Sequence, residues 1–152
     1  MLSTNKVFAY ITHGDQILVF RHVDFPEAGI QIPGGTIEEG EEPEEAVLRE
    51  AYEETGLVEL HLACHLGSDD WIILNNRCSV ELRLRHFYHL ICKPCVPDSW
   101  QHDELHPSDG SPAPITFEFF WLPVTEATAA LEPYYIANID KLSGSLPRFI
   151  LG

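Results

Sequence analysis

Positive charge is scarce in this sequence. Nine lysines and arginines stand against 24 aspartates and glutamates, which gives a formal net charge of −15 at pH 7. A surface with this excess of negative charge repels the phosphates of duplex nucleic acid and of anionic membranes. We therefore expect neither of them as an unassisted partner. Bound cations would reverse the local field and admit a phosphate ligand.

Long apolar runs are missing as well. No segment approaches the roughly 20 apolar residues that a membrane-spanning helix needs, and residues 1–6 (MLSTNK) lack the apolar segment of a signal peptide. Internal repeats, low-complexity segments and linkers are also absent from the sequence. Its 152 residues fit one domain, residues 1–152, and 45% hydrophobic residues suffice for a core. The sequence therefore predicts a cytoplasmic protein of one domain.

Cysteine is sparse. The chain has four, Cys64, Cys78, Cys92 and Cys95. One close pair, Cys92-Lys93-Pro94-Cys95, would offer zinc ligands if the other two cysteines, His86 or His89 joined it. Zinc sites usually show two such tight pairs. We interpret the cysteines as ordinary reduced thiols, with a zinc site as the alternative.

Acidic residues, by contrast, are abundant between Glu38 and Glu54, where nine of the 24 lie. On a helix, residues at i, i+3 and i+4 are neighbours, so Glu50, Glu53 and Glu54 would share one narrow face. Adjacent carboxylates repel one another, and carboxylate oxygens are the preferred ligands of hard divalent cations. This spacing predicts a metal site. A solvated acidic helix face is the alternative.

The residues around these acids predict a helix that begins near Pro43 and stops at Gly56. Proline suits a first helical turn, and glycine suits the left-handed position after a last turn. We expect a core-facing stripe on this helix, with the acids pointing outward. Its members would be Leu48, Ala51, Tyr52 and Thr55. Ahead of the helix, Pro33-Gly34-Gly35 predicts a tight loop whose backbone approaches a ligand closely.

Residues 35–57 (GTIEEGEEPEEAVLREAYEETGL) resemble the signature box of the Nudix hydrolases. That box is Gly, five residues, Glu, seven residues, Arg-Glu, an aliphatic, any residue, Glu-Glu, any residue, Gly and an aliphatic. All its fixed positions are matched, by Gly35, Glu41, Arg49, Glu50, Glu53, Glu54 and Gly56. Ala51 is small for its aliphatic position. The resemblance implies the Nudix fold, of α+β or α/β class, with a mixed β-sheet sandwiched between α-helices.

The resemblance also implies roles for residues of the box. Glu50, Glu53 and Glu54 would bind Mg²⁺ or Mn²⁺ together with the Gly34 carbonyl, and Glu50 or Glu53 would serve as the catalytic base. Supporting roles would fall to Arg49, Glu41 and Gly35. Arginine cannot act as a base, so Arg49 would fix a neighbouring carboxylate through a bidentate pair. Glu41 would close the loop or reach a metal through water.

Residues outside the box would complete the site. Glu118, a charge inside an apolar strand, is one candidate for a further acid, and Glu104 and Asp109 are others. An outward position on a half-exposed strand is the alternative for Glu118. The candidates for substrate binding are Arg21, Trp100 and His102, with Trp71, Tyr134 and Tyr135 as further aromatics able to stack a base.

Residues 93–114 show no strand or helix pattern. We expect a long loop there that forms part of the substrate pocket, because long loops of this kind are often functional. A surface excursion is the alternative. Elsewhere the pattern predicts strands at 6–12, 16–21, 31–33, 58–67, 71–74, 80–92 and 115–122, and helical segments at 126–131 and 134–142.

Together these features predict a metal-dependent hydrolase. It would cleave the pyrophosphate bond of a nucleoside diphosphate linked to another group, nucleoside triphosphates included. A non-catalytic Nudix-fold nucleotide-binding or sensor module is the alternative, and the complete set of box acids favours the enzyme. A small-molecule nucleotide is the expected partner. The sequence leaves both the particular substrate and the oligomeric state open, a homodimer included.

Overall fold

The structure is a computed structural model, and it describes residues 2–74, 79–94, 96–105, 112 and 114–142. Its strands are β1 (Leu2–His13), β2 (Gln16–His22), β3 (Gly34–Thr36), β4 (Leu60–Leu74), β5 (Val80–Cys92), β6 (Ser99–Glu104) and β7 (Ile115–Pro123). The α-helices are α1 (Pro43–Thr55) and α2 (Val124–Ala130). Three 3-10 turns complete the description, η1 (Pro26–Ala28), η2 (Pro133–Tyr135) and η3 (Ile139–Lys141).

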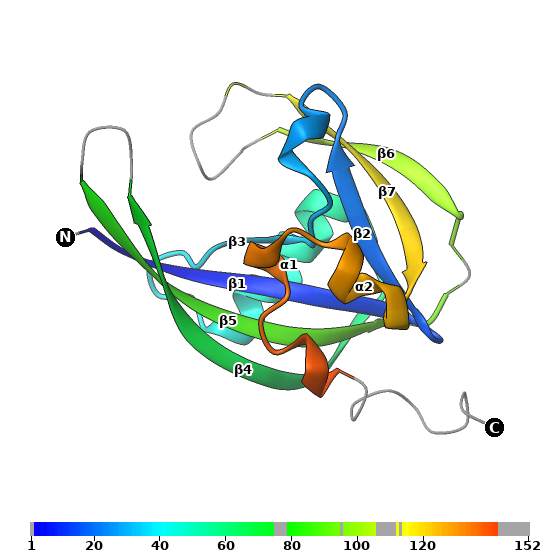
Figure 1. The fold of residues 1–152 in the computed structure, drawn as a ribbon. Helices are drawn as coiled ribbons and strands as arrows, with labels where there is room; N and C mark the ends of the chain where they lie inside the picture. Colours follow the sequence, from blue (N-terminus) through cyan, green and yellow to red (C-terminus); the bar gives the residue numbers. More distant parts are fainter. Residues whose placement is uncertain (1, 75–78, 95, 106–111, 113, 143–152) are drawn as a thin grey trace.

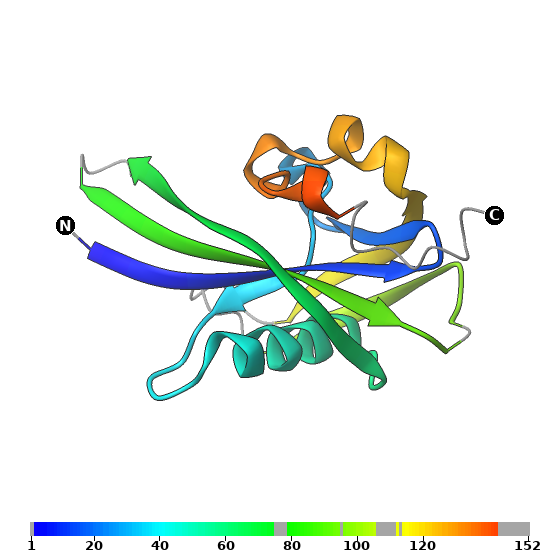
Figure 2. The ribbon, with the colours of Figure 1, turned by 90° about the horizontal axis from the view of Figure 1, so that it is seen from below.

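All seven strands belong to one mixed sheet. Its order is β4-β5-β1-β2-β7-β6, with β3 paired to β1 beside this path. β1 and β5 run parallel, and the other pairs are antiparallel. Figure 2 shows α1 on one face of the sheet and α2 with the following turns on the other. The predicted mixed sheet between helices is confirmed.

The sheet opens in its middle. β1 and β2 pair only beside their turn, at Thr12↔Ile17 and His13↔Gln16, and then diverge (Figure 1). The segment from residue 30 to 36 fills the gap between them. It bonds to β2 through the backbone of Gln31, and its last part is β3, on β1. Two wings of the sheet therefore flank the glycine pair at the start of β3.

Two hydrophobic cores cover the two faces of the sheet, because alternate residues of a strand point to opposite faces. The core under α1 includes Val7, Ala9, Leu18, Phe20, Val47, Ala51 and Phe119. The core under α2 and the turns includes Phe8, Tyr10, Ile17, Val19, Phe87, Leu131 and Leu142. Among the described residues, no helix is long and apolar enough to cross a membrane.

Four predictions for segments differ from the structure. The two strands expected at 58–67 and 71–74 form one strand, β4. The strand expected at 31–33 lies three residues later, at Gly34–Thr36, where it pairs with β1. The stretch 93–114, expected to be a loop, contains β6 paired with β7. Residues 134–142 form 3-10 turns in place of a helix, and Asn138 between them has a left-handed backbone with φ 62°.

Candidate metal and pyrophosphate site

Helix α1 is fixed at both ends. Pro43 occupies the first turn, and Gly56 ends the helix at φ 79°, both as predicted. Strand β6 holds the last turn, because the Trp100 indole N–H donates to the Thr55 carbonyl at 2.9 Å. His102 Nε2 lies 3.0 Å from the Glu53 carbonyl oxygen. The helix is thus held in one position against the sheet.

We expected the acids of α1 to point outward, but two of them point inward. Glu50 and Glu54 are buried, whereas Glu53 is exposed. Tyr52, which was expected in the core stripe, is 54% exposed. The buried face of the helix is therefore rotated toward Glu50 and Glu54, because these carboxylates point into the opening of the sheet, where glycines leave room for them.

The glycine pair makes this close approach feasible. The Gly34 N–H donates to Glu54 Oε2 at 2.8 Å. A Cβ on Gly35 would lie 2.1 Å from the carboxyl carbon of Glu50, which is far inside van der Waals contact. Only glycine therefore lets this backbone lie directly against the carboxylates of α1.

Arg49 connects the acids of the box. Its Nε and Nη2 donate to the two oxygens of Glu41 at 2.7 and 2.9 Å, so Glu41 is its bidentate partner. Its Nη1 donates to Glu50 at 2.9 Å and to Glu53 at 3.2 Å. Nη2 also donates to the Thr36 carbonyl. This pairing lowers the pKa of Glu41 and raises that of Arg49.

The buried carboxylates resist ionisation. Burial raises the pKa of Glu50 to about 7, against the opposing effect of Arg49. Burial also raises the pKa of Glu54 well above its ordinary value, although the Gly34 N–H acts in the other direction. Glu104 adds to the rise at both residues, through like-charge repulsion. A bound cation would remove this penalty, because it stabilises the charged forms.

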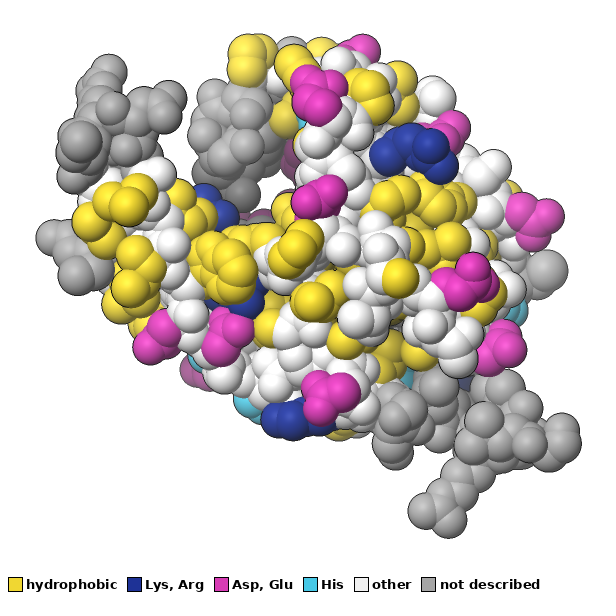
Figure 3. All heavy atoms as spheres, viewed as in Figure 1, with side chains coloured by type: hydrophobic (Ala, Val, Ile, Leu, Met, Phe, Trp, Pro, Cys, Tyr) yellow, Lys and Arg dark blue, Asp and Glu magenta, His cyan; other side chains and the backbone are white. Residues whose placement is uncertain are grey.

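These residues line a pocket of about 700 Å³. Its acidic end consists of Gly34, Gly35, Glu50, Glu54 and Glu104. The remaining wall is largely aromatic, with Phe8, Phe20, Phe25, Phe117, Tyr134 and Tyr135. Figure 3 views the molecule from the side of α2, and it shows hydrophobic side chains gathered over α2 and the turns that follow it. A pocket of this volume that combines aromatic side chains with charged groups at fixed positions is typical of a small-molecule site.

The candidate residues outside the box fall into two groups. Glu104, a buried residue at the end of β6, lies in the pocket with Glu50 and Glu54. Glu118 instead pairs with Arg21 at 3.1 Å, and neither of them lines the pocket. They lie on the face of β2 and β7 opposite to Phe117 and Phe20, which do line it. Asp109 is outside the described residues.

Trp100 and His102 do not line the pocket either, contrary to expectation. Both side chains bond to the last turn of α1, and the Trp100 ring stacks on Phe119 with centroids 5.5 Å apart. The pairing of β6 with β7 turns Trp100, His102 and Glu104 toward α1, and of these three only Glu104, at the end of the strand, reaches the pocket. The pocket residues that the sequence missed include two cations, Lys6 and Arg83, whose position depends on strand register.

The donor set of the site fits a hard divalent cation, because every group at the acidic end offers oxygen. Among the described residues, no three His, Cys, Asp or Glu side chains are arranged to hold a metal as they stand. Arg49 bonds to Glu50 and Glu53 in this arrangement. A cation bound by Glu50 and Glu53 would therefore compete with Arg49 for their carboxylate oxygens.

The cysteines lie elsewhere. Cys64 lies on β4, and Cys92 is buried on β5. Cys78 and Cys95 lie outside the described residues, so Cys92 is the one member of the CxxC pair that the structure describes. His89, one of its proposed ligands, is fully buried with Nε2 2.7 Å from the Thr12 hydroxyl.

Comparison with curated proteins finds a short stretch of similarity. The RNA pyrophosphohydrolase of Cereibacter sphaeroides is 39% identical over 56 residues, which is 37% of this chain and 35% of that protein. The matched region thus spans about a third of the length of the relative.

Solved structures share the fold over nearly the whole chain. A MutT NUDIX hydrolase from Burkholderia pseudomallei is 20% identical with a TM-score of 0.58, over 93% of this chain and 99% of that one. The E. coli dihydroneopterin triphosphate pyrophosphohydrolase is 16% identical with a TM-score of 0.63, over 93% and 97%. A NUDIX hydrolase from Nitrosomonas europaea is 22% identical with a TM-score of 0.59, over 98% and 95%.

The family model for the NUDIX domain matches residues 3–141, which include the acidic end of the pocket and all of the sheet except Leu2. The resemblance seen in residues 35–57 therefore extends to the entire fold. The chain belongs to the NUDIX domain family.

Proposed function

We propose that this protein is a metal-dependent pyrophosphohydrolase that cleaves a pyrophosphate bond in a small nucleotide substrate. The observation that carries the proposal is the buried pair Glu50 and Glu54, held against the Gly34-Gly35 backbone at the end of a pocket. Burying carboxylates together is costly unless a cation offsets their charge. A nucleotide-sized pocket beside them supplies the place for a phosphate ligand.

Glu50, Glu53 and Glu54 would hold Mg²⁺ or Mn²⁺, with the Gly34 carbonyl as a further ligand. A divalent metal there supplies charge neutralisation at the phosphate oxygens and lowers the pKa of a bound water. Glu50 or Glu53 would accept the proton of the attacking water at a carboxylate oxygen. Glu104 is the further acid that we propose in place of Glu118, because it shares the pocket. Arg49 and Glu41 would orient Glu50 and Glu53.

The names of two similar proteins support this reaction class. One relative is an RNA pyrophosphohydrolase, and one protein of the same fold is a dihydroneopterin triphosphate pyrophosphohydrolase. Both names specify pyrophosphate cleavage. We infer that this chain performs the same type of cleavage, on a nucleotide or on a 5′-phosphorylated end of RNA.

A phosphate-release screen tests the proposal. Nucleoside triphosphates, nucleotide sugars, dinucleotides and a short 5′-triphosphorylated RNA are incubated with the protein and Mg²⁺ or Mn²⁺. Products are separated by ion-exchange chromatography. We expect at least one substrate to be cleaved, with activity abolished by EDTA and restored by excess metal. Cleavage that persists in EDTA contradicts the metal role, and binding without turnover favours a sensor module.

A further inference from the structure

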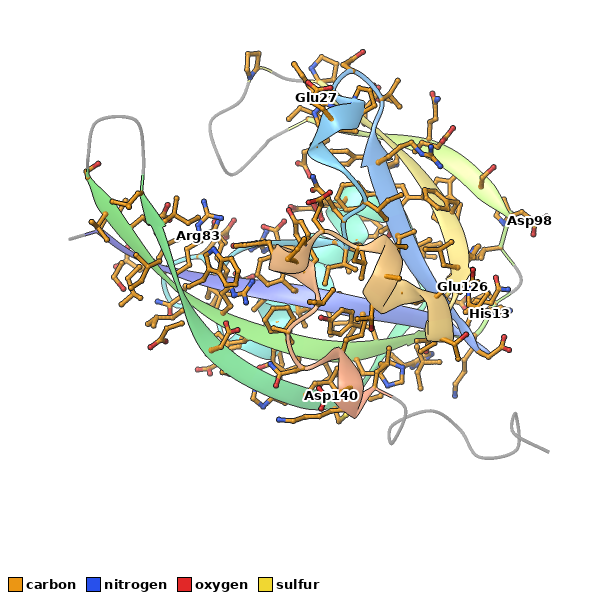
Figure 4. All side chains as sticks on the ribbon, viewed as in Figure 1. His13, Glu27, Arg83, Asp98, Glu126 and Asp140 are labelled. Atoms are coloured by element: carbon orange, nitrogen blue, oxygen red, sulfur yellow. The ribbon has the colours of Figure 1, made fainter. Side chains whose placement is uncertain are left out.

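The pocket has a basic wall in addition to its acidic end. Lys6 on β1 and Arg83 on β5 both line it. In a chain with only nine lysines and arginines against 24 acids, two cations in one pocket call for a physical reason. Figure 4 labels Arg83 on the wing of the sheet that faces the opening.

Strand register places the two cations together. β1 and β5 are parallel with Thr4 opposite Arg83, so Lys6, two residues after Thr4, shares a face of the sheet with Arg83. On its other side β1 pairs with β3, where Lys6 is opposite Thr36 and the next residue is opposite Gly35. The basic wall is therefore adjacent to the glycine pair that holds the acidic end.

Polar contacts fix the heads of both cations. Lys6 Nζ donates to the Thr36 hydroxyl at 2.7 Å. Arg83 Nη1 donates to the Tyr134 hydroxyl at 2.9 Å, and its Nε donates to Glu81 at 3.2 Å. A guanidinium has five N–H donors and a lysine ammonium has three. Arg83 thus has donors beyond those that these two contacts use.

A second arginine holds the wall in place. Arg85 is buried and forms a bidentate pair with Asp69, both distances being 2.7 Å. Its Nη1 donates to the Tyr134 carbonyl, and its guanidinium lies over the rings of Tyr134 and Trp71, 4.6 Å from each centroid. Tyr134, the partner of Arg83, is thereby anchored before any ligand arrives. Such preorganisation lowers the cost of binding.

We propose that Lys6 and Arg83 bind a phosphate group of the substrate beyond the pyrophosphate held at the carboxylates. The favoured substrates are then nucleotides with a chain of at least three phosphates, and nucleoside diphosphates linked to an uncharged sugar are poorer ones. Charge-assisted hydrogen bonds to the additional phosphate give the preference. This inference rests on the proposed function, because it specifies the substrate of the same site.

The test compares kcat/KM for a nucleoside triphosphate and for a nucleoside diphosphate sugar with the same base, in Mg²⁺. We expect the wild type to prefer the triphosphate. Arg83→Gln and Lys6→Gln should each lower kcat/KM for the triphosphate roughly 10- to 100-fold, mainly through KM, since a lost charged contact costs about 1.5–3 kcal/mol. The value for the nucleotide sugar should change less than about threefold. Arg83→Lys should restore part of the preference.

Arg21→Gln is the matched control. Arg21 is also a strand arginine whose Nε bonds to a glutamate, at 3.1 Å, but it does not line the pocket. The Arg21→Gln substitution removes the same charge and should leave the preference for the triphosphate over the nucleotide sugar intact. The melting temperature of each variant identifies any loss of folding.

Calorimetric binding of inorganic triphosphate with Mg²⁺ gives a readout that needs no turnover. Arg83→Gln and Lys6→Gln should weaken this binding at least about tenfold relative to Arg21→Gln. If the variants still hydrolyse nucleotides with an unchanged substrate preference, the phosphate role of Lys6 and Arg83 is overturned, and the proposed function stands. If the wild type hydrolyses neither a nucleotide nor a 5′-triphosphorylated RNA, the proposed function fails. Equal triphosphate binding by wild type and variants then overturns the inference as well.

Discussion

At the scale of single residues, Glu50 and Glu54 are positioned for metal binding at a cost to the stability of the folded protein. Both are buried on the face of α1 that meets the glycine pair, and burial raises the pKa of each carboxyl group. A residue chosen for stability alone would be apolar at these positions. A bound cation would offset the free energy that burying these carboxylates costs the folded state. Metal binding should therefore raise the free energy of unfolding, which can be measured.

Glu54→Gln should therefore leave the metal-free protein equally stable or stabilise it by roughly 1 kcal/mol, about 2–4 °C in Tm. The amide keeps an acceptor for the Gly34 N–H but carries no charge. The rise in Tm that Mg²⁺ or Mn²⁺ causes should shrink in this variant. Thermal unfolding with and without metal measures both effects, with the exposed Glu39→Gln as control. Clear destabilisation of the metal-free variant would show that Glu54 has a structural role.

His89 gives a pH dependence that is independent of the site. Burial lowers its pKa from 6.5 to about 4. The unfolded chain therefore takes up a proton at His89 at a higher pH than the folded protein does. The stabilising contribution is complete above pH 6.5 and is lost as the pH falls toward 4, by about 2.5 kcal/mol at pH 4.5.

Urea unfolding of wild type and His89→Gln at several pH values tests this sign. The free energy of unfolding of the wild type should fall relative to the variant between pH 6.5 and 4.5. A constant difference across that range would mean that His89 titrates alike in both states.

At the scale of elements, the sequence located α1 correctly and overlooked β6. The helix has clear terminal signals, Pro43 and Gly56, and a motif with fixed spacing. The inward side chains of strand β6 are Trp100, His102 and Glu104, and two of these are polar. Inward and outward residues of β6 therefore do not differ in hydrophobicity as they do in a typical strand. Strands of this kind are recognisable only from their partner, here β7. The same limit applies to Lys6 and Arg83, whose meeting depends on register between distant strands.

Strand β6 should act as a support for α1. Trp100→Ala should lower the free energy of unfolding by about 2–3 kcal/mol, because it removes the stacking on Phe119 and the bond to the Thr55 carbonyl. Trp100→Phe keeps an aromatic ring and should lose only about 1 kcal/mol. Chemical denaturation measures both. Unchanged stability with a raised KM would instead place Trp100 in the substrate pocket, as the sequence had suggested.

At the scale of the whole molecule, the opening of the sheet is what positions the site. β1 and β2 separate, the segment from 30 to 36 enters between them, and α1 closes the opening from one face (Figure 2). The acids of α1 and the cations of β1 and β5 then meet in one pocket. The spacing of the box predicted the acids. It did not predict the opening, because that depends on where two strands stop pairing.

The kcat of Glu50→Gln on the best substrate, with saturating Mg²⁺, is the sharpest test of whether the buried carboxylates hold a catalytic metal. The substitution keeps the shape of a buried side chain in the pocket and removes its charge. We expect this kcat to fall at least about 100-fold relative to both wild type and Glu39→Gln, because metal-held charge stabilisation is lost. Turnover of the folded Glu50→Gln variant within a few-fold of wild type would contradict this expectation.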